Sequence, residues 1–139
     1  MKINFRHKTE LRVRYGETDQ MGYCYYGNYA QYFEVGRVET LRSLGISYKE
    51  LEDQGVMLPV SDFSVKYKYP AKYDDALTIE TSITEVRGAR LLFDYSVTNE
   101  AGQLVATAHT TLVFVAKETM RPITPPESFS LIIKPYEQN

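Results

Sequence analysis

The sequence contains no tryptophan, only two histidines and a single cysteine among its 139 residues. One cysteine, Cys24, cannot form an internal disulfide, which fits a reducing compartment. His7 and His109 lie in predicted strands and are not spaced with cysteine or acidic residues as metal ligands are. We therefore expect no metal site. We interpret Cys24 as a packed thiol and both histidines as structural; a Cys24–histidine pair stays open, but no local signature supports it.

Charge of one sign and long apolar runs are also missing. The formal net charge is −2, so the sequence lacks the basic surface that is typical of nucleic-acid binders. Residues 1–19 carry a charge every few positions, which predicts neither a signal peptide nor a membrane span. We therefore expect a cytoplasmic protein without nucleic-acid partners.

Several familiar motifs do not occur. There is no GxGxxG or GxxxxGK[ST] phosphate-binding loop and no GxSxG nucleophile motif. A chain of 139 residues with 43% apolar and 24% charged residues suits a domain with its own core. Since no repeat or linker interrupts it, we predict a single domain over residues 1–139.

Tyrosine, in contrast, is abundant. There are 12 tyrosines, and six of them fall between residues 15 and 32. Half-buried strand and helix positions are one explanation. The alternative is a surface that meets a ligand or a partner subunit, because tyrosine carries both a ring and a hydroxyl group.

One long helix is predicted near this tyrosine-rich region. Asn28 is a good N-cap and Gly45 a good stop, which predicts a helix over residues 29–44. Its first half has almost no polar face, so we expect it to be buried on nearly all sides. Gly36 lies in mid-helix, where glycine is unfavourable, and this predicts the close approach of a strand or another helix.

Strand patterns occupy most of the remaining sequence. Alternation indicates a strand over residues 2–14, broken near residues 8–10, and Ser47 is expected to cap a short helix over 48–54. Four long strands follow, over residues 57–69, 76–87, 90–99 and 103–117. Long antiparallel strands and one buried helix predict an α+β fold, with a curved sheet wrapped around the helix. We expect the proline-rich tail over 123–139 to be an edge element or loosely held.

An acidic cluster, Glu17-Thr18-Asp19, lies in a glycine-flanked loop just before the predicted helix. The first N–H groups of a helix lack internal partners and carry partial positive charge, so they can hold a developing oxyanion. A carboxylate opposite them can attack a carbonyl group or activate a water, which is the minimum for acyl-transfer hydrolysis. From spacing alone, a turn or capping role is the simpler explanation of Asp19.

These residues carry a resemblance to a known family. RVRYGETDQMGYCYYGNYAQYFEVGR resembles the N-terminal signature of the 4-hydroxybenzoyl-CoA thioesterase family of hot-dog proteins, and later segments match as far as KETMRPITPP. The likeness covers residues 10–126 in gap-free order. It implies a hot-dog fold and an acyl-CoA thioesterase for small or medium, aliphatic or aromatic acyl groups. It implies no cofactor, because coenzyme A is part of the substrate.

The resemblance also implies roles for single residues. Asp19 matches the family's catalytic aspartate, as nucleophile or general base, and the backbone N–H of Tyr26 matches the donor that polarises the thioester carbonyl. Gly22 is expected to permit close backbone approach, and Asn28 to orient the entry into the helix. Many members carry histidine where this chain has Tyr26, so a polar helper is missing and the acyl class stays open.

Charged residues farther along the chain are weaker candidates. Arg87 and Arg90 flank a strand turn where related enzymes place cations for the phosphates of coenzyme A, although both also suit an ordinary solvated turn. Lys117 is a weaker candidate for the same task. Glu34 and Arg37 are spaced for an ion pair, and Glu34 is an alternative auxiliary acid because a related hot-dog lineage uses a helix glutamate.

Assembly and alternatives follow from the same resemblance. Members join two sheets edge to edge with the active sites at the interface, so we expect Asp19 to face Asp62, Phe63 and Val65 of a partner copy. A homodimer is the expected minimum and a homotetramer the expected assembly. An acyl carrier protein thioesterase, a dehydratase or hydratase, and a non-catalytic acyl-CoA-binding module are the alternatives. They would show, respectively, a basic docking patch, a histidine beside the helix, and loss of the acid.

Overall fold

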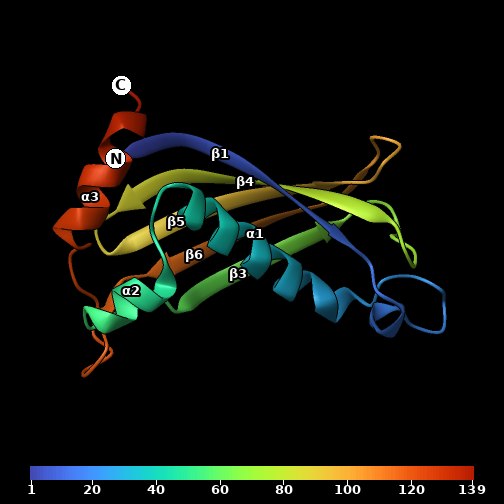
Figure 1. Cartoon of the computed structure of the whole chain (residues 1–139), viewed down its shortest axis with the longest axis horizontal. Coiled ribbons are helices and arrows are strands. Elements are labelled where there is room, and N and C mark those ends of the chain that lie inside the picture. Colours follow the sequence, from blue (N-terminus) through green and yellow to red (C-terminus); the bar gives the residue numbers. More distant parts are fainter.

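The computed structural model describes residues 1–139 as a curved antiparallel sheet with one long helix packed across it (Figure 1). The five-stranded sheet has the order β1-β4-β5-β6-β3, and a separate two-stranded sheet pairs β2 with β7. The strands are β1 (Lys2–Arg12), β2 (Val56–Met57), β3 (Val60–Tyr67), β4 (Ala76–Arg87), β5 (Arg90–Thr98), β6 (Leu104–Val113) and β7 (Val115–Ala116). The α-helices are α1 (Tyr29–Ser43), α2 (Tyr48–Asp53) and α3 (Glu127–Ile133), and the 3-10 helices are η1 (Tyr15–Glu17), η2 (Tyr26–Asn28) and η3 (Lys134–Tyr136). The predicted α+β arrangement is confirmed.

The core lies between the sheet and α1, as the alternation of the strands dictates. In β4, every second side chain from Leu77 to Ile83 is buried, while those between them are partly exposed. Antiparallel sheets commonly bury one face and leave the other to solvent. Phe33 of α1 packs against Tyr95 of β5 with ring centroids 4.8 Å apart. The helix therefore covers the apolar face of the sheet.

Gly36 lets α1 approach the sheet closely. A Cβ atom at this position would lie 2.6 Å from Oγ1 of Thr81 and 3.0 Å from Cγ2 of Ile79, both on β4. The predicted close approach is confirmed. The prediction of burial on nearly all sides was wrong, because Ala30, Glu34 and Val35 form an exposed face of α1 in the single chain.

The two ends of α1 differ in how far they match the prediction. At its C-terminal end, Gly45 has φ +86°, and the N–H of Ile46 donates to the carbonyl of Leu41, as in a glycine-terminated helix. At its start, Asn28 has helical backbone angles and its side chain makes no capping hydrogen bond. The N-cap prediction was wrong because η2 precedes α1 directly and continues into it.

Three further predictions need correction. The first strand runs unbroken through residues 8–10. The strand predicted over 57–69 is split after Met57, since Pro59 cannot donate to a sheet ladder, and the one over 103–117 is split at Phe114. The tail is not loose: Phe129 and Ile133 of α3 are buried, and Phe129 packs on Phe114 with ring centroids 5.0 Å apart. No helix is long and apolar enough to cross a membrane.

Candidate active site

A pocket of about 330 Å³ lies between the loop that precedes α1 and the segment that follows β3. Its lining is mostly apolar and aromatic, with one carboxylate: Asp19, Met21, Tyr23, Cys24, Tyr26, Tyr29, Tyr67, Lys68, Tyr69, Pro70 and Ala71. The two segments are joined by a hydrogen bond of 2.7 Å from the N–H of Cys24 to the carbonyl of Ala71. The acid singled out from the sequence therefore lies in a formed cavity.

Asp19 is half-buried and held by its own loop. Its Oδ1 accepts hydrogen bonds from the N–H of Met21 at 2.9 Å and of Tyr23 at 3.4 Å, while Oδ2 makes none within the chain. The loop closes through the carbonyl of Asp19, which accepts the N–H of Gly22 at 3.0 Å. Asp19 therefore fulfils the turn role, and one carboxylate oxygen is left for another partner.

Gly22 is required by its backbone conformation. Its φ is +81°, which side-chain-bearing residues adopt only at a cost. Apart from its two sequence neighbours, no residue has an atom within 4 Å of the position that its Cβ would occupy. Within the chain, conformation rather than packing explains the glycine. Close approach of a substrate at Gly22 stays a prediction.

Two backbone N–H groups at the start of η2 have no acceptor within the chain. The N–H groups of Tyr25 and Asn28 donate to the carbonyls of Glu17 and Tyr25, respectively, but those of Tyr26 and Gly27 make no hydrogen bond. Tyr26 also lines the pocket that contains Asp19. The N–H of Tyr26 therefore lacks an internal acceptor, and it belongs to η2 rather than to α1; its role as the donor to a substrate carbonyl stays a prediction.

Asn28 links this helix start to the acidic loop. Its Nδ2 donates to the carbonyl oxygen of Glu17 at 2.7 Å. This contact ties the start of the helix to the acidic loop and is not a helix cap. Its effect on substrate binding stays a prediction.

The tyrosine-rich region divides into a buried and an exposed group. Tyr29 and Tyr32 are buried, and burial raises the pKa of each hydroxyl well above its ordinary value. Tyr67 packs edge-on against Tyr29 and Tyr26, with ring centroids 5.2 and 6.4 Å apart. Tyr29 and Tyr32 therefore match the explanation by packed positions, whereas contact of the exposed tyrosines with a ligand or a partner subunit stays a prediction.

Cys24 behaves as a packed thiol. It is buried, and its Sγ donates to the hydroxyl of Tyr32 at 3.3 Å. Burial raises the pKa of the thiol above its ordinary value, which opposes formation of the thiolate. His109 is paired with Asp94 at 2.8 Å on β5, away from Cys24 in the pocket. No group of three or more His, Cys, Asp or Glu side chains could hold a metal ion.

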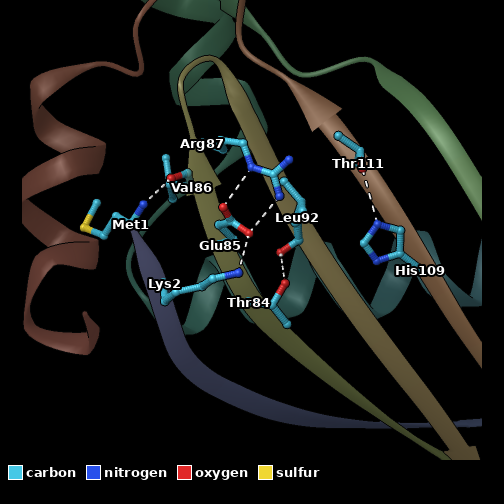
Figure 2. Close-up of polar contacts among 9 residues, drawn as sticks. All are labelled: Met1, Lys2, Thr84, Glu85, Val86, Arg87, Leu92, His109 and Thr111. Atoms are coloured by element: carbon cyan, nitrogen blue, oxygen red, sulfur yellow. Dashed lines mark hydrogen bonds and ion pairs between the residues drawn. The ribbon is translucent and has the colours of Figure 1, made fainter. Parts of the chain in front are cut away.

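Arg87 and Arg90 lie at the opposite end of the molecule from Asp19. Their turn follows β4, whose 12 residues span about 36 Å at the usual rise of a strand. Arg87 is bound to Glu85 through two hydrogen bonds of 2.8 and 3.0 Å, and Lys2 binds the same carboxylate at 2.9 Å (Figure 2). Arg90 makes no ion pair or hydrogen bond through its side chain. A single chain does not bring either arginine to the pocket.

The predicted pair of Glu34 and Arg37 does not form. Glu34 is exposed, whereas Arg37 is only 8% exposed and turns inward, where its Nε has no hydrogen-bond partner. Burial alone would lower the pKa of Arg37, but the nearby hydroxyls of Tyr95 and Tyr48 outweigh it and the pKa is raised. The helix instead carries an i,i+3 ion pair between Glu39 and Arg42.

The β3 edge of the sheet is open. Val60, Phe63 and Tyr67 are 45%, 40% and 47% exposed although they are large and apolar. Soluble proteins usually cover or blunt such an edge. Phe63, one of the residues expected at a partner interface, also packs on Phe33 with ring centroids 6.0 Å apart.

Sequence reasoning missed the connecting role of Glu17 and Tyr32. The Tyr32 hydroxyl donates to Oε1 of Glu17 at 2.7 Å, across 15 residues of sequence. Glu17 was visible as part of the acidic cluster, but Tyr32 reads as an ordinary core position of a helix. No spacing rule would have paired the two.

Known proteins are similar to this chain in sequence and in fold. The family described as the thioesterase-like superfamily matches residues 13–132. A relative from Escherichia coli O6:H1, the acyl-CoA thioester hydrolase YbgC, is 35% identical over 118 residues, which cover 85% of this chain and 88% of the relative. The solved structure of a DHNA-CoA thioesterase from Staphylococcus aureus has a TM-score of 0.90 and 34% identity, over 94% of this chain and 90% of that one. A 4-hydroxybenzoyl CoA thioesterase mutant in complex with 4-hydroxybenzoyl CoA has a TM-score of 0.84 and 25% identity, over 92% and 98% of the two chains.

Proposed function

The chain belongs to the thioesterase-like superfamily and acts as an acyl-CoA thioesterase, and we propose that Asp19 is its catalytic carboxylate. The family resemblance seen in the sequence is thereby confirmed. One observation carries the assignment of Asp19: Oδ1 is fixed by two backbone N–H groups while Oδ2 is unused, in a pocket that is also lined by Tyr26, whose N–H has no acceptor within the chain.

The chemistry follows from these two groups. The N–H of Tyr26 donates to the thioester carbonyl oxygen, where negative charge develops, and one such donor is typically worth about 10²–10³ in rate. Asp19 Oδ2 either attacks the carbonyl carbon, giving a mixed anhydride that water then hydrolyses, or removes a proton from the attacking water. In both routes the C–S bond breaks and coenzyme A leaves as the thiolate. The products are the free acid and CoA, and no cofactor takes part.

The pocket suits a compact acyl group. A volume of about 330 Å³ with a largely apolar and aromatic lining fits small or medium acyl groups, aliphatic or aromatic. Rings of Tyr29 and Tyr67 offer edges and faces to an aromatic acyl group, and their hydroxyls can accept or donate a hydrogen bond to a polar substituent.

Coenzyme A would be held with the help of a second copy. When two copies pair their β3 edges about a two-fold axis, the two β3 strands are antiparallel. The β4–β5 turn of one copy then lies toward the Asp19 end of the other copy. Arg90 of that copy is unpaired and suits a phosphate, whereas Arg87 is already bound to Glu85. We therefore expect a homodimer as the minimum unit and a homotetramer as the assembly. The cytoplasmic location expected from the sequence is retained as part of the proposal.

Thiol release from a panel of acyl-CoA thioesters, short aliphatic to aromatic, tests the role of Asp19. The Asp19→Asn variant keeps an oxygen for the N–H groups of Met21 and Tyr23, so it should fold normally and lose about 100-fold or more in kcat. Asp75→Asn is the matched control, because Asp75 is also half-buried and accepts a backbone N–H, that of Lys72 at 2.8 Å, outside the pocket. Equal rates for the two variants would remove Asp19 from the mechanism. If the wild type releases thiol from none of these acyl-CoA thioesters, the assay would be repeated with carrier-protein thioesters.

A further inference from the structure

We propose that Glu17 and Tyr32 form a positioning pair, which holds the Asp19 loop against the start of α1 and so fixes the carboxylate relative to the Tyr26 N–H. Neither residue needs to touch the substrate. The inference rests on the proposed function, because it assumes that Asp19 and the Tyr26 N–H act together.

The backbone of Glu17 is tied to both sides of Tyr26. Its carbonyl oxygen accepts the N–H of Tyr25 at 2.7 Å and Nδ2 of Asn28 at 2.7 Å. Tyr25 precedes the free N–H of Tyr26 and Asn28 follows it by two residues. The position of this one carbonyl therefore sets where the oxyanion donor lies relative to the acidic loop.

The side chain of Glu17 extends the connection into the helix. Its Oε1 accepts the N–H of Arg14 at 2.8 Å and the hydroxyl of Tyr32 at 2.7 Å. The Glu17 side chain is 11% exposed and Tyr32 is 4% exposed, so water competes little for these contacts. Glu17 thus joins the end of β1, the acidic loop and the first turn of α1 within one network.

The charge states suit this arrangement. Burial alone would raise the pKa of Glu17, but hydrogen bonds from the Arg14 N–H and Tyr32, with the charge of Arg14, hold it below its ordinary value. Burial raises the pKa of the Tyr32 hydroxyl, which keeps it protonated. At neutral pH the pair is a phenol donating to a carboxylate, which is a strong type of hydrogen bond.

Small shifts at Glu17 reach the reacting groups directly. Asp19 is two residues away, and the bridge between Thr18 and Cys24 joins the intervening residue to the pocket lining. A misplacement of about 1 Å between reacting groups can cost about 10²-fold in rate. Loosening the Glu17–Tyr32 contact should therefore lower kcat more than it alters KM.

Tyr32→Phe against Tyr95→Phe is the matched test. Tyr95 is 3% exposed, and its hydroxyl pairs with Thr110 at 2.7 Å, so each substitution removes one buried hydroxyl with one hydrogen bond of 2.7 Å to a side chain. Tyr32→Phe also removes the longer contact of 3.3 Å from Sγ of Cys24. With the best acyl-CoA of the panel, we expect Tyr32→Phe to lose about 10-fold in kcat with a smaller change in KM, while Tyr95→Phe keeps kcat. Equal kcat values for the two variants would overturn the inference and leave the role of Asp19 untouched.

Two further variants separate positioning from folding. Glu17→Gln retains an acceptor oxygen for Tyr32, so it should keep most of the kcat that Glu17→Ala loses. This pair of variants tests the inference if Tyr32→Phe does not fold. In the Asp19→Asn background, Tyr32→Phe should have no further effect on kcat, because the group that it positions is already gone. An undiminished loss in that background contradicts the inference. If Asp19→Asn alone kept full activity, both the proposed role of Asp19 and the inference that depends on it would be wrong.

Discussion

The two ends of the sheet each contain a nearly covered glutamate, and the two carboxylates have different partners. Near the pocket, Glu17 accepts hydrogen bonds from a backbone N–H and a phenol through Oε1, and its Oε2 forms one ion pair of 3.5 Å with the exposed Arg14. At the end where α3 packs, Glu85 binds two cations, Lys2 and Arg87 (Figure 2). Their side chains are almost equally covered, at 11% and 12% exposure.

The difference indicates that the two ends of the sheet have different roles: the pocket end serves catalysis, and the α3 end serves stability. At the α3 end the polar contacts around Glu85 are mutually satisfied: Glu85 meets its cations, and the N-terminal ammonium of Met1 donates to the carbonyl of Val86. At the pocket end some groups are unsatisfied, namely Oδ2 of Asp19 and the N–H groups of Tyr26 and Gly27. Unused polar groups around a pocket are those that a substrate can engage.

Replacing the buried Phe129 of α3 with alanine should have the largest effect on the free energy of unfolding. Phe129 is buried against Phe114, and replacing a buried phenylalanine with alanine typically costs about 3–5 kcal/mol. We expect Phe129→Ala to lose that amount in urea unfolding while kcat, measured well below the transition, stays unchanged. A parallel fall in kcat would show that the two ends are not separable.

Two glycines provide a matched comparison of the ends. Gly22 and Gly88 both have positive φ, +81° and +57°, and open space where a Cβ atom would lie. Replacing either with alanine should cost about 1–2 kcal/mol of unfolding free energy through backbone strain. Only Gly22→Ala should also lower kcat, because Gly22 closes the loop that fixes Asp19. Equal kcat values would argue that this loop tolerates distortion.

A smaller effect is expected at the β4–β5 turn. Arg90→Ala should raise KM for acyl-CoA about 2- to 5-fold, the range of an exposed ion pair, with weaker dependence on salt than wild type. Arg87→Ala should chiefly lower stability, because Arg87 is bound to Glu85. An Arg90→Ala enzyme with unchanged KM would remove this residue from coenzyme A binding.

The smallest expected effect is a pH dependence at the α3 end. Hydrogen bonds from Arg87, then from Lys2, lower the pKa of Glu85 from its ordinary value of 4.5 to about 2. Because the folded-state pKa is lowered, this stabilisation is complete above about pH 4.5 and is lost as pH falls toward 2. Wild type should therefore exceed Glu85→Gln in unfolding free energy at pH 7 by more than at pH 3. A constant difference would contradict the ion-pair account.

The sequence predicted the parts of the molecule that depend on local patterns. Alternation located β4 and β5, Gly45 ended the long helix, and Gly36 marked its contact with the sheet. It failed where tertiary context decides: Asn28 binds Glu17 instead of capping, Arg37 turns inward, and the tail folds as α3 because Phe129 packs into the core. The two groups that donate to the Glu17 side chain lie three residues before it and 15 after it, and only the folded chain brings them together.

Measuring both activity and stability of Asp19→Asn and Glu85→Gln tests most directly whether the pocket end serves catalysis and the α3 end serves stability. For each variant, kcat at saturating acyl-CoA and the free energy of unfolding at pH 7 would be measured side by side with wild type. The account predicts that Asp19→Asn loses about 100-fold or more in kcat with stability preserved. It predicts that Glu85→Gln loses stability with kcat preserved. The opposite assignment, or variants that lose both properties together, would contradict it.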